Sequence, residues 1–447
     1  MGKRMRGTRQ KGACNSEDQI SELPNDLIAP ILSCLTLKEA LRTSIVSKQW
    51  RYLWTSVSAL NFDANETLDK IAANPELRDV ERSKYINFVN HVVKHHRGLT
   101  IDEFRICFDL DETSNDDIEG WVQFAMRKEV QRLVLDLSEN GESIREHSQN
   151  CTFPLRLVEG MQHCNFGFKS LKSLSLKWVN INGQVFEYLL SNCTVLEHLS
   201  IYSSGDLVNV RVAGLSLKLK SLELVFCLGL EKIEICDTNL VSFTYLGPVI
   251  SLYLNNVPML KMLYIGEGDS GLKNDIFSQL SCCHSQLEFL TLDMLHPERN
   301  MKLPSLPEFS NLKKLVLKIG ARADDSLLQF TSLMIKACPY LDRFVLELIW
   351  KSPARRRRKV GKAAQSPHQH LKLVEIIGYF GRSSDDELVM YFFENAVALQ
   401  KIVIDPHTEI LKQNLSVIGQ NKWEENARFR ARKLESKKPR DVEFVIL

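Results

Sequence analysis

The chain has 447 residues and a formal net charge of +2, from 57 Lys and Arg and 55 Asp and Glu. A charge this close to zero excludes a protein whose whole surface is basic, such as one built to coat nucleic acid. Hydrophobic residues make up 44% of the chain, and no run approaches about 18 consecutive apolar residues, so the composition predicts a globular protein without a transmembrane helix.

The N-terminal arm, residues 1–18, is basic, and no apolar stretch follows it, so we do not expect a secretory signal. The 11 cysteines are an odd number, which predicts free thiols in a reducing compartment. We therefore expect the protein in the nucleus, the cytoplasm or both, with no membrane partner.

Residues 19–54 have the pattern of three short helices. Pro24 suits the first turn of a helix, because an N–H at that position would be unpaired anyway. Thr36 can cap a second helix that runs through Ile45, and a third, rich in aromatic residues, is expected over 48–54. So small a core needs a partner or a neighbouring domain to be stable. Apolar residues of the first helix recur at helical spacing: Leu27, Ile28, Ile31, Leu32 and Leu35.

From residue 130 onward, the pattern apolar-x-x-apolar-x-apolar recurs, and after the first interval it does so every 20 to 30 residues. That spacing is typical of leucine-rich repeats. Each segment predicts a short strand with one buried face, and stacked repeats would bury those faces in one parallel sheet. With helices between the strands, as at 185–193 and 325–338, the fold class is α/β, an irregular horseshoe. The segments lie at 130–135, 171–176, 196–201, 219–224, 240–245, 260–265, 287–292, 312–317, 341–346, 371–376 and 399–404.

Two segments interrupt this pattern. Residues 351–370 contain seven Lys and Arg and no acidic residue, which predicts a loop. The run Arg355–Lys359 within it is either a nuclear-import signal or phosphate-binding patch, or simply a solvated loop. We expect no nucleic-acid partner. Residues 422–443 carry mixed charges and are expected to begin as a helix.

Residues 20–54 resemble the plant F-box motif. The matching features are Leu23-Pro24, the apolar pairs of the first helix, Ala40, Val46-Ser47-Lys48 and the cluster Trp50–Trp54. Segments 118–135, 191–201 and 371–404 are similar to plant F-box/FBD/leucine-rich-repeat proteins. Composition, the repeats and the resemblance together predict these regions, of which the arm and the basic loop lie outside the resemblance: a basic arm (1–18), F-box (19–60), linker of helices and a strand (61–129), leucine-rich repeats (130–350), basic loop (351–370) and FBD region (371–447).

What the family does is implied by the resemblance alone. F-box proteins bind a Skp-type adaptor, which joins them to a cullin–RING ubiquitin ligase, and their other domain binds a protein substrate. The chain would be non-catalytic, without cofactor or metal. An alternative is an F-box solenoid that binds a partner or small ligand outside any ligase. Adaptor contact is expected from Leu23, Pro24, Leu27, Ile28, Ile31, Leu32, Leu35, Val46, Trp50, Leu53 and Trp54.

Two details of that expectation stay open. Either face of the first helix can be the one that meets the adaptor. Trp50 and Trp54 belong to the core by their spacing, and by the resemblance their segment also contacts the adaptor. The substrate cannot be read from the sequence. Candidate recognition residues beside the strand leucines are Lys172, Glu197, His198, Lys220 and Glu223.

An enzyme is a third hypothesis, because Gly266–Gly271 matches G-x-G-x-x-G between a strand and a helical pattern, with Asp293 where a ribose-binding acid would stand. The flanking strands already belong to the repeats, however. Glu267 and Asp269 would also place negative charge where a pyrophosphate lies. We therefore expect a glycine-rich turn and no nucleotide.

Other patterns point weakly to metals. His91 and His95 have helical spacing and His96 adjoins them, but no further ligand is evident, so we expect a solvated helix face or a packing role. Asp109-x-Asp111-x-Thr113 begins like a calcium loop, but Ser114 replaces the required glycine, so we expect an acidic surface loop. Cysteines that precede repeat strands at similar offsets are expected in the buried core: Cys193, Cys282, Cys283 and Cys338.

Overall fold

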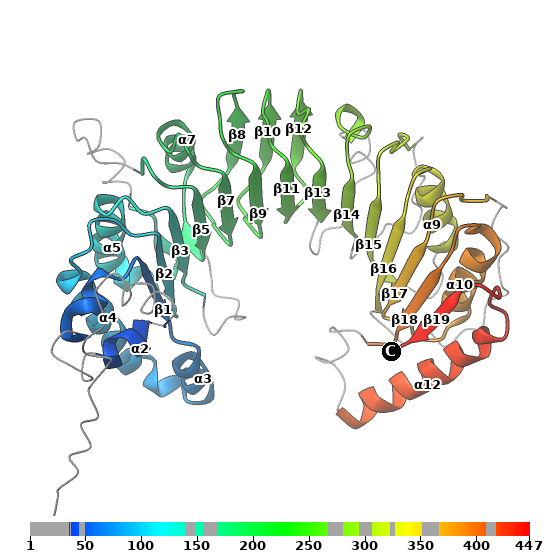
Figure 1. The fold of residues 1–447 in the computed structure, drawn as a ribbon, viewed down its shortest axis with the longest axis horizontal. Coiled ribbons are helices and arrows are strands. Elements are labelled where there is room, and N and C mark those ends of the chain that lie inside the picture. The colour runs from blue at the N-terminus through cyan, green and yellow to red at the C-terminus, as the bar shows by residue number, and fades with distance from the viewer. Residues whose placement is uncertain are drawn as a thin grey trace, which may run out of the picture.

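The computed structural model describes residues 35, 37–43, 50–138, 149–154, 168–266, 280–294, 306–321, 327–350, 366–407 and 417–447. These residues form an arch whose strands follow one another from the N-terminal to the C-terminal end (Figure 1). Among them, no helix is both long enough and apolar enough to cross a bilayer.

The main sheet has 14 strands, all parallel and in chain order. All eleven predicted strands are confirmed, as β3 to β18 of this sheet, and β1, β2 and β19 extend it at its two ends. The strands are β1 (Ala59–Asp63), β2 (Glu103–Cys107), β3 (Arg132–Asp136), β5 (Ser173–Lys177), β7 (His198–Tyr202), β9 (Ser221–Val225), β11 (Ser242–Leu246), β13 (Met262–Gly266), β14 (Phe289–Met294), β15 (Lys314–Ala321), β16 (Arg343–Trp350), β17 (Leu373–Ile377), β18 (Lys401–Asp405) and β19 (Glu443–Ile446).

The core lies behind the main sheet, because every second strand residue points away from the concave face. Leu174, Leu199, Leu222 and Phe243 stand in register on neighbouring strands and are at most 1% exposed. A fully buried side chain of this size contributes about 1.5–3 kcal/mol. The periodic leucines of the sequence therefore form one continuous apolar row through the whole arch.

Helices cover the outer side of the arch in its flanks (Figure 1). The predicted helices 185–193 and 325–338 are confirmed as α7 and α9, and the C-terminal helical start is confirmed as α12. The helices are α2 (Leu37–Arg42), α3 (Asn65–Ala73), α4 (Arg78–His95), α5 (Asn115–Arg127), α7 (Gly183–Asn192), α9 (Leu327–Lys336), α10 (Ser383–Asn395) and α12 (Val417–Glu435), with short 3₁₀ turns η2 (Trp50–Ser56), η3 (Pro75–Leu77), η4 (Glu112–Ser114) and η7 (Leu280–Cys282).

The middle of the arch corrects the expectation of helices between strands. Three short strands there, β8 (Asn209–Ala213), β10 (Lys232–Cys236) and β12 (Ser251–Asn255), form a second parallel sheet on the outer side. Their inward residues, such as Val210 and Ile233, are buried and their alternate residues face outward. A further small pair, β4 (Cys151–Thr152) and β6 (Val179–Asn180), lies beside the start of α5, where the N–H of Thr152 donates to the Asn115 side chain at 2.9 Å.

Left-handed corners turn the chain out of several strands. Trp178, Ser203 and Phe226 directly follow β5, β7 and β9 and have φ of 59°, 56° and 54°. Such a conformation costs about 1–2 kcal/mol for a residue with a side chain. Each of the three N–H groups donates to the carbonyl of the last residue of the next strand in the main sheet, which is β7, β9 or β11. The three distances are 2.9, 2.8 and 2.6 Å. The corner thus satisfies a backbone group and ties each repeat to its successor.

Candidate functional site

The described part of the predicted F-box joins the core of the solenoid. Leu37 and Ala40 of α2 are 3% and 1% exposed, and Leu41 is packed beside them. The third predicted helix is the 3₁₀ helix η2. Trp54 is buried there, while Leu53 and the preceding Leu35 are partly buried against the same core.

The adaptor-contact prediction is only partly within the described residues. Seven of its residues lie outside them: Leu23, Pro24, Leu27, Ile28, Ile31, Leu32 and Val46. The backbone of Trp50 opens η2, and its side chain is not described. Adaptor contact therefore stays a prediction. The structure adds that Trp54 packs inward.

The junction between η2 and the solenoid is made by close contacts. The Trp54 ring stacks on His91 of α4, with 6.5 Å between centroids. The carbonyl of Thr55 accepts from the N–H groups of Arg97 and Gly98, at 2.7 and 3.2 Å. Nε2 of His96 lies 3.0 Å from the carbonyl oxygen of Val57. The C-terminal end of the F-box region is thus fixed against α4 and the start of the sheet.

The three histidines of α4 and its end are held by packing and hydrogen bonds. Nδ1 of His95 lies 2.8 Å from the His91 carbonyl oxygen. His96 is buried, its ring lies perpendicular to that of Phe124 at 5.7 Å between centroids, and burial lowers its pKa. Within the described part of the chain, no group of three or more His, Cys, Asp or Glu is placed to hold a metal.

The calcium-like motif is a buried ion-pair network, which corrects the expectation of a surface loop. Asp109 is fully buried, with its carboxylate 2.6 Å from Nη2 of Arg82 and 3.2 Å from Nε of Arg78. Arg82 also pairs with Asp111. Burial alone would raise the pKa of Asp111, but hydrogen bonds from Thr113 and the charge of Arg82 lower it. The network fixes α4 to the loop after β2. The sequence missed it because the two arginines stand about 30 residues earlier.

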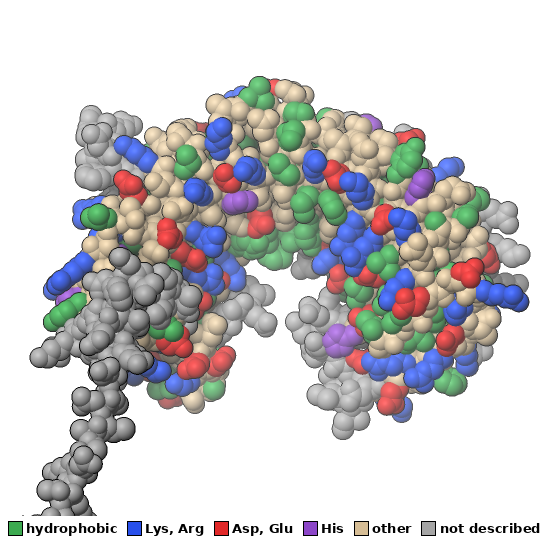
Figure 2. All heavy atoms as spheres, viewed as in Figure 1, with side chains coloured by type: hydrophobic (Ala, Val, Ile, Leu, Met, Phe, Trp, Pro, Cys, Tyr) green, Lys and Arg blue, Asp and Glu red, His purple; other side chains and the backbone are tan. Residues whose placement is uncertain are grey.

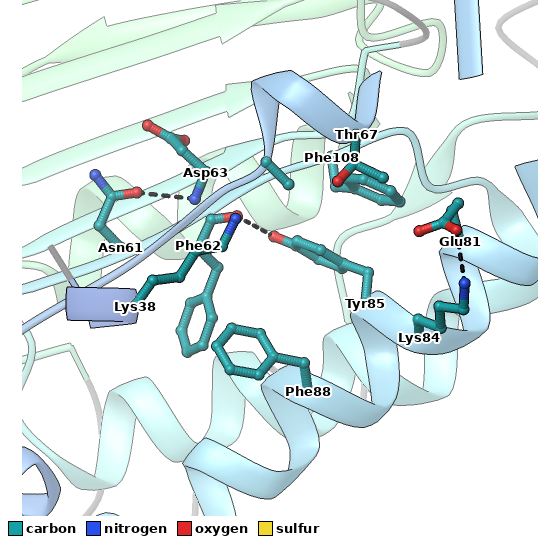
Figure 3. A pocket seen from close by; sticks show the side chains of 11 residues that line it. Lys38, Asn61, Phe62, Asp63, Thr67, Glu81, Lys84, Tyr85, Phe88 and Phe108 are labelled. Carbon is teal, nitrogen blue, oxygen red and sulfur yellow. Dashed lines mark hydrogen bonds and ion pairs between the residues drawn. The ribbon is translucent and has the colours of Figure 1, made fainter. Parts of the chain in front are cut away.

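A small pocket lies between α2, β1, α3 and α4, with a volume of about 160 Å³ (Figure 3). The Tyr85 hydroxyl points across it and donates to the carbonyl of Phe62 at 2.7 Å. The Phe62 and Phe88 rings meet edge to face at 5.9 Å, and Tyr85 stacks on Phe108 at 4.1 Å. Pockets for small ligands usually measure about 300–1,000 Å³. These contacts therefore indicate a packed joint near the F-box region.

The middle of the concave face is rich in hydroxyl groups. Glu223 accepts there from the Tyr202 hydroxyl at 2.9 Å and from Ser200. Burial, and then the charge of Glu223, raise the pKa of Tyr202 to about 12. The outward residues of these strands include Ser173, Ser175, Ser200, Ser221, Ser242 and Thr244.

Of the candidate recognition residues, His198 and Glu223 lie on this concave face. The other three precede the strands and form a ladder along the rim. Nζ of Lys172 donates to Gln131 at 2.9 Å, and Nζ of Lys220 pairs with Glu197 at 2.9 Å. Ladder residues are thus engaged with each other, and the concave residues are better placed to meet a partner.

The glycine motif begins inside the sheet. Gly266 ends β13 and stands opposite Asp293 of β14. A Cβ on Gly266 would lie 2.5 Å from Leu246 and 2.6 Å from Asp293, so close packing of three strands requires glycine here. Residues 267–271 lie outside the described part of the chain.

The cysteine prediction is confirmed at three positions and wrong at one. Cys193, Cys283 and Cys338 are buried in the core, whereas Cys282 is exposed. Cys282 ends η7 with its side chain exposed, and Cys283 takes the core position. Burial raises the pKa of Cys193 to about 12.

The C-terminal end of the arch is closed by α12. The Phe380 ring packs on Trp423 of α12 at 4.3 Å, and Arg430 donates to the Gly381 carbonyl at 2.6 Å. Asp385, which is fully buried, accepts from the N–H groups of Phe380 and Arg382 at 3.0 Å each. These contacts order the loop before α10 and cover the last repeats.

Comparison with known proteins agrees with this architecture. Residues 20–61 match the F-box domain, and residues 92–434 match the family described as "At1g61320/AtMIF1, LRR domain". The chain is 25% identical over 426 residues to the F-box/FBD/LRR-repeat protein At2g26030 of Arabidopsis thaliana, covering 87% of this chain and 92% of that protein. A second relative from that plant, At5g53840 of the same description, is 25% identical over 419 residues, covering 87% and 88%.

A third Arabidopsis thaliana relative, the F-box/FBD/LRR-repeat protein At1g13570, is 33% identical over 200 residues, covering 43% of this chain and 46% of that protein. An F-box followed by a parallel α/β solenoid defines an F-box protein of the leucine-rich-repeat class. The chain belongs to the plant family of F-box/FBD/LRR-repeat proteins, as its sequence predicted.

Proposed function

We propose that the chain is the substrate-recognition subunit of an SCF-type ubiquitin ligase. In this proposal the F-box binds a Skp-type adaptor, the adaptor binds a cullin–RING ligase, and the concave face binds a protein substrate. The observation that carries the proposal is the junction. Leu37, Ala40, Trp54 and Val57 belong to the same buried cluster as the first strands, so an adaptor docked at the F-box keeps a fixed relation to the concave face.

The proposed mechanism is proximity without bond chemistry by this chain. The complex would hold a substrate lysine close to a ubiquitin-charged conjugating enzyme, which replaces a bimolecular encounter by a local one. A flexible connection gives effective concentrations near the mM range, and a rigid one gives much higher values. The continuous sheet favours the rigid case, because its 14 strands pair without a break.

A stable contact between F-box and adaptor is expected to bury about 1,600 Å² in total. We further propose that the protein works in the nucleus, the cytoplasm or both, with Arg355–Lys359 as the import signal. That run lies outside the described residues, and a fluorescent fusion with the five basic residues replaced by Gln tests it. Nuclear signal that is unchanged by the replacement contradicts this role.

Coexpression with a Skp-type adaptor tests the adaptor step. The two should copurify, and Leu23→Ala with Pro24→Ala should abolish that. A matched double variant, Leu99→Ala with Pro75→Ala, removes the same residue types at exposed positions and should retain the adaptor. Retention by both variants contradicts the proposal. Retention of adaptor by the wild-type chain without association with cullin would favour the scaffold outside a ligase.

A further inference from the structure

One row of side chains crosses the concave face from β13 to β16. Met262, Phe289, Lys314 and Arg343 are direct partners in the registers of these parallel strands. Neighbouring strands lie about 4.8 Å apart, so consecutive side chains of the row are in contact range. We call these four residues the apolar–cation patch.

The first half of the patch is apolar and open. Met262 is 46% exposed and Phe289 is 39% exposed, although each stands in the middle of a 14-stranded sheet. The equivalent positions on the two preceding strands are Ser221 and Ser242, so the large apolar side chains begin at β13. Exposed aromatic side chains on a rigid sheet are common anchors for a binding partner, because little entropy is lost when they are covered.

The second half of the patch contains a charge that no described carboxylate pairs with. Seven Lys and Arg residues lie in the described strands of the main sheet, and six of them pair with a carboxylate within 4.0 Å. Lys314 is the exception among them. Its neighbours in the register are Phe289 and Arg343, and Arg343 directs Nη2 away from it to Glu375 at 2.6 Å.

Like charges on neighbouring strands repel, and nothing on this chain's described strands offsets the charge of Lys314. Figure 2 shows Lys and Arg side chains gathered over β14–β16 on the inner side of the arch, next to hydrophobic side chains below β9–β13. The next outward residues on β15 and β16 are Val316 and Val345, which supply an apolar floor beside the cation. An anion that reaches Lys314 would therefore be partly shielded from water, which strengthens the pair.

We propose that the apolar–cation patch binds a short segment of a partner protein in which a large apolar side chain adjoins a carboxylate. The apolar group covers Met262 and Phe289, and the carboxylate pairs with Lys314. This deepens the proposed function and rests on it, since the partner would be the substrate. The charge left unpaired on Lys314 selects the acidic partner over a basic one.

The test uses the full chain copurified with adaptor, on an array of 12-residue peptides. The probes place Leu-Asp, Leu-Asn, Ala-Asp or Leu-Lys in one Gly-Ser frame. Wild type should retain Leu-Asp best, by about fivefold or more over the others. Lys314→Glu should shift the preference to Leu-Lys, and Phe289→Ala should lower retention of Leu-Asp to the level of Ala-Asp.

Two control variants make comparable changes, a cation to Glu and an aromatic residue to Ala, on the outer sheet. Arg211→Glu and Tyr253→Ala, at side chains exposed on β8 and β12, should leave the preference unchanged. All variants should still copurify with adaptor, so failure here is distinct from failure of the proposed ligase role. If Lys314→Glu does not fold, Lys314→Met should lose the difference between Leu-Asp and Leu-Asn. Equal retention of the four probes by wild type, or an unchanged preference in the Lys314 variants, overturns the inference.

Discussion

The middle and the flanks of the arch cover the core behind the main sheet with different elements. The three intervals between the equivalent core positions Leu199 and Leu263 measure 23, 21 and 20 residues, and they contain the outer strands β8, β10 and β12. The intervals that contain α7, α9 and α10 measure 25, 29 and 28 residues. A five-residue strand spans about 17 Å and a ten-residue helix about 15 Å. Among these six intervals, the shorter ones therefore cover the core with a strand and the longer ones with a helix.

That choice also affects the shape of the molecule. A helix is about 10 Å wide, whereas neighbouring strands lie about 4.8 Å apart. Helices on the outer side must therefore fan out from a sheet whose strands are closer together. The arch bends through its helical flanks, and its middle runs nearly straight (Figure 1). Four changes test how the two regions differ, in order of expected effect.

Removing a core ring should destabilise the flank more than the middle. Phe243 and Phe344 hold equivalent core positions and are fully buried. Phe243→Ala should lower the free energy of unfolding by about 3–5 kcal/mol. Phe344→Ala should cost about 0.5–1.5 kcal/mol more, because Phe344 also packs on the Phe392 ring of α10 at 5.5 Å. Urea unfolding measures both values, and a larger loss at Phe243 would contradict the comparison.

Removing Arg82 should unfold the N-terminal flank more readily. Arg82→Met removes one of the two arginines that pair with the buried Asp109 and breaks the pair with Asp111. We expect a loss of about 3 kcal/mol, because one partner of a buried pair is removed. Lys84→Met on the same helix breaks the exposed pair with Glu81 and should change stability by less than about 0.5 kcal/mol. Thermal unfolding that gives similar shifts for both variants would show that the network contributes little.

Adding a methyl group should harm the middle and not the flank. A Cβ on Gly229 would lie 2.3 Å from the Gly205 carbonyl oxygen of the preceding repeat, whereas on Gly183, at the start of α7, the nearest atom is 3.9 Å away. Gly229→Ala should cost about 1–3 kcal/mol. Gly183→Ala should be neutral or stabilising by up to about 1 kcal/mol, because alanine favours the helix. Denaturant midpoints check this, and a tolerated Gly229→Ala would mean that the middle repeats can separate.

The smallest effect concerns the C-terminal flank and depends on pH. Burial raises the pKa of Asp385 to about 6, above its unfolded value of 3.8. The folded protein therefore binds this proton more tightly, so the contribution to stability is gained as pH falls through about 6 and lost as pH rises. Between pH 7.5 and 5 it should amount to about 1–1.5 kcal/mol. Asp385→Asn should remove this part of the pH dependence.

The measurement is the difference between wild type and Asp385→Asn at each pH. A difference is needed because burial also lowers the pKa of His96 and His368. These two histidines make the folded protein less stable as pH falls below about 6.5. Their contribution is common to both proteins and cancels. Parallel stability curves for the two proteins would contradict the buried-carboxylate explanation.

The sequence predicts the part of the fold that repeats and much less of the rest. Alternating leucines determine the strands and their burial, because every repeat must bury the same face. The outer strands β8, β10 and β12 fall outside the prediction, because short alternations such as Val210-x-Val212 do not follow the repeated leucine pattern of the main sheet. Asp109 was misplaced because its partners on α4 are distant in sequence.

The candidate surfaces show the same division. Aligning the repeats would have placed Phe289, Lys314 and Arg343 side by side, since each begins a strand. That no described carboxylate pairs with Lys314 follows only from the three-dimensional arrangement of its neighbours. The adaptor-contact residues from Leu23 to Val46 depend on the family resemblance and stay a prediction.

In the proposed function, one chain joins a ubiquitin-ligase core to a recognition surface. Size-exclusion chromatography with light scattering tests it directly, using the full chain mixed with purified Skp-type adaptor and cullin–RING pair. We predict one complex that contains one copy of each component. The double variant Leu23→Ala with Pro24→Ala should not form this complex. Elution of the chain apart from the adaptor, or with the adaptor but apart from the cullin, would contradict the account.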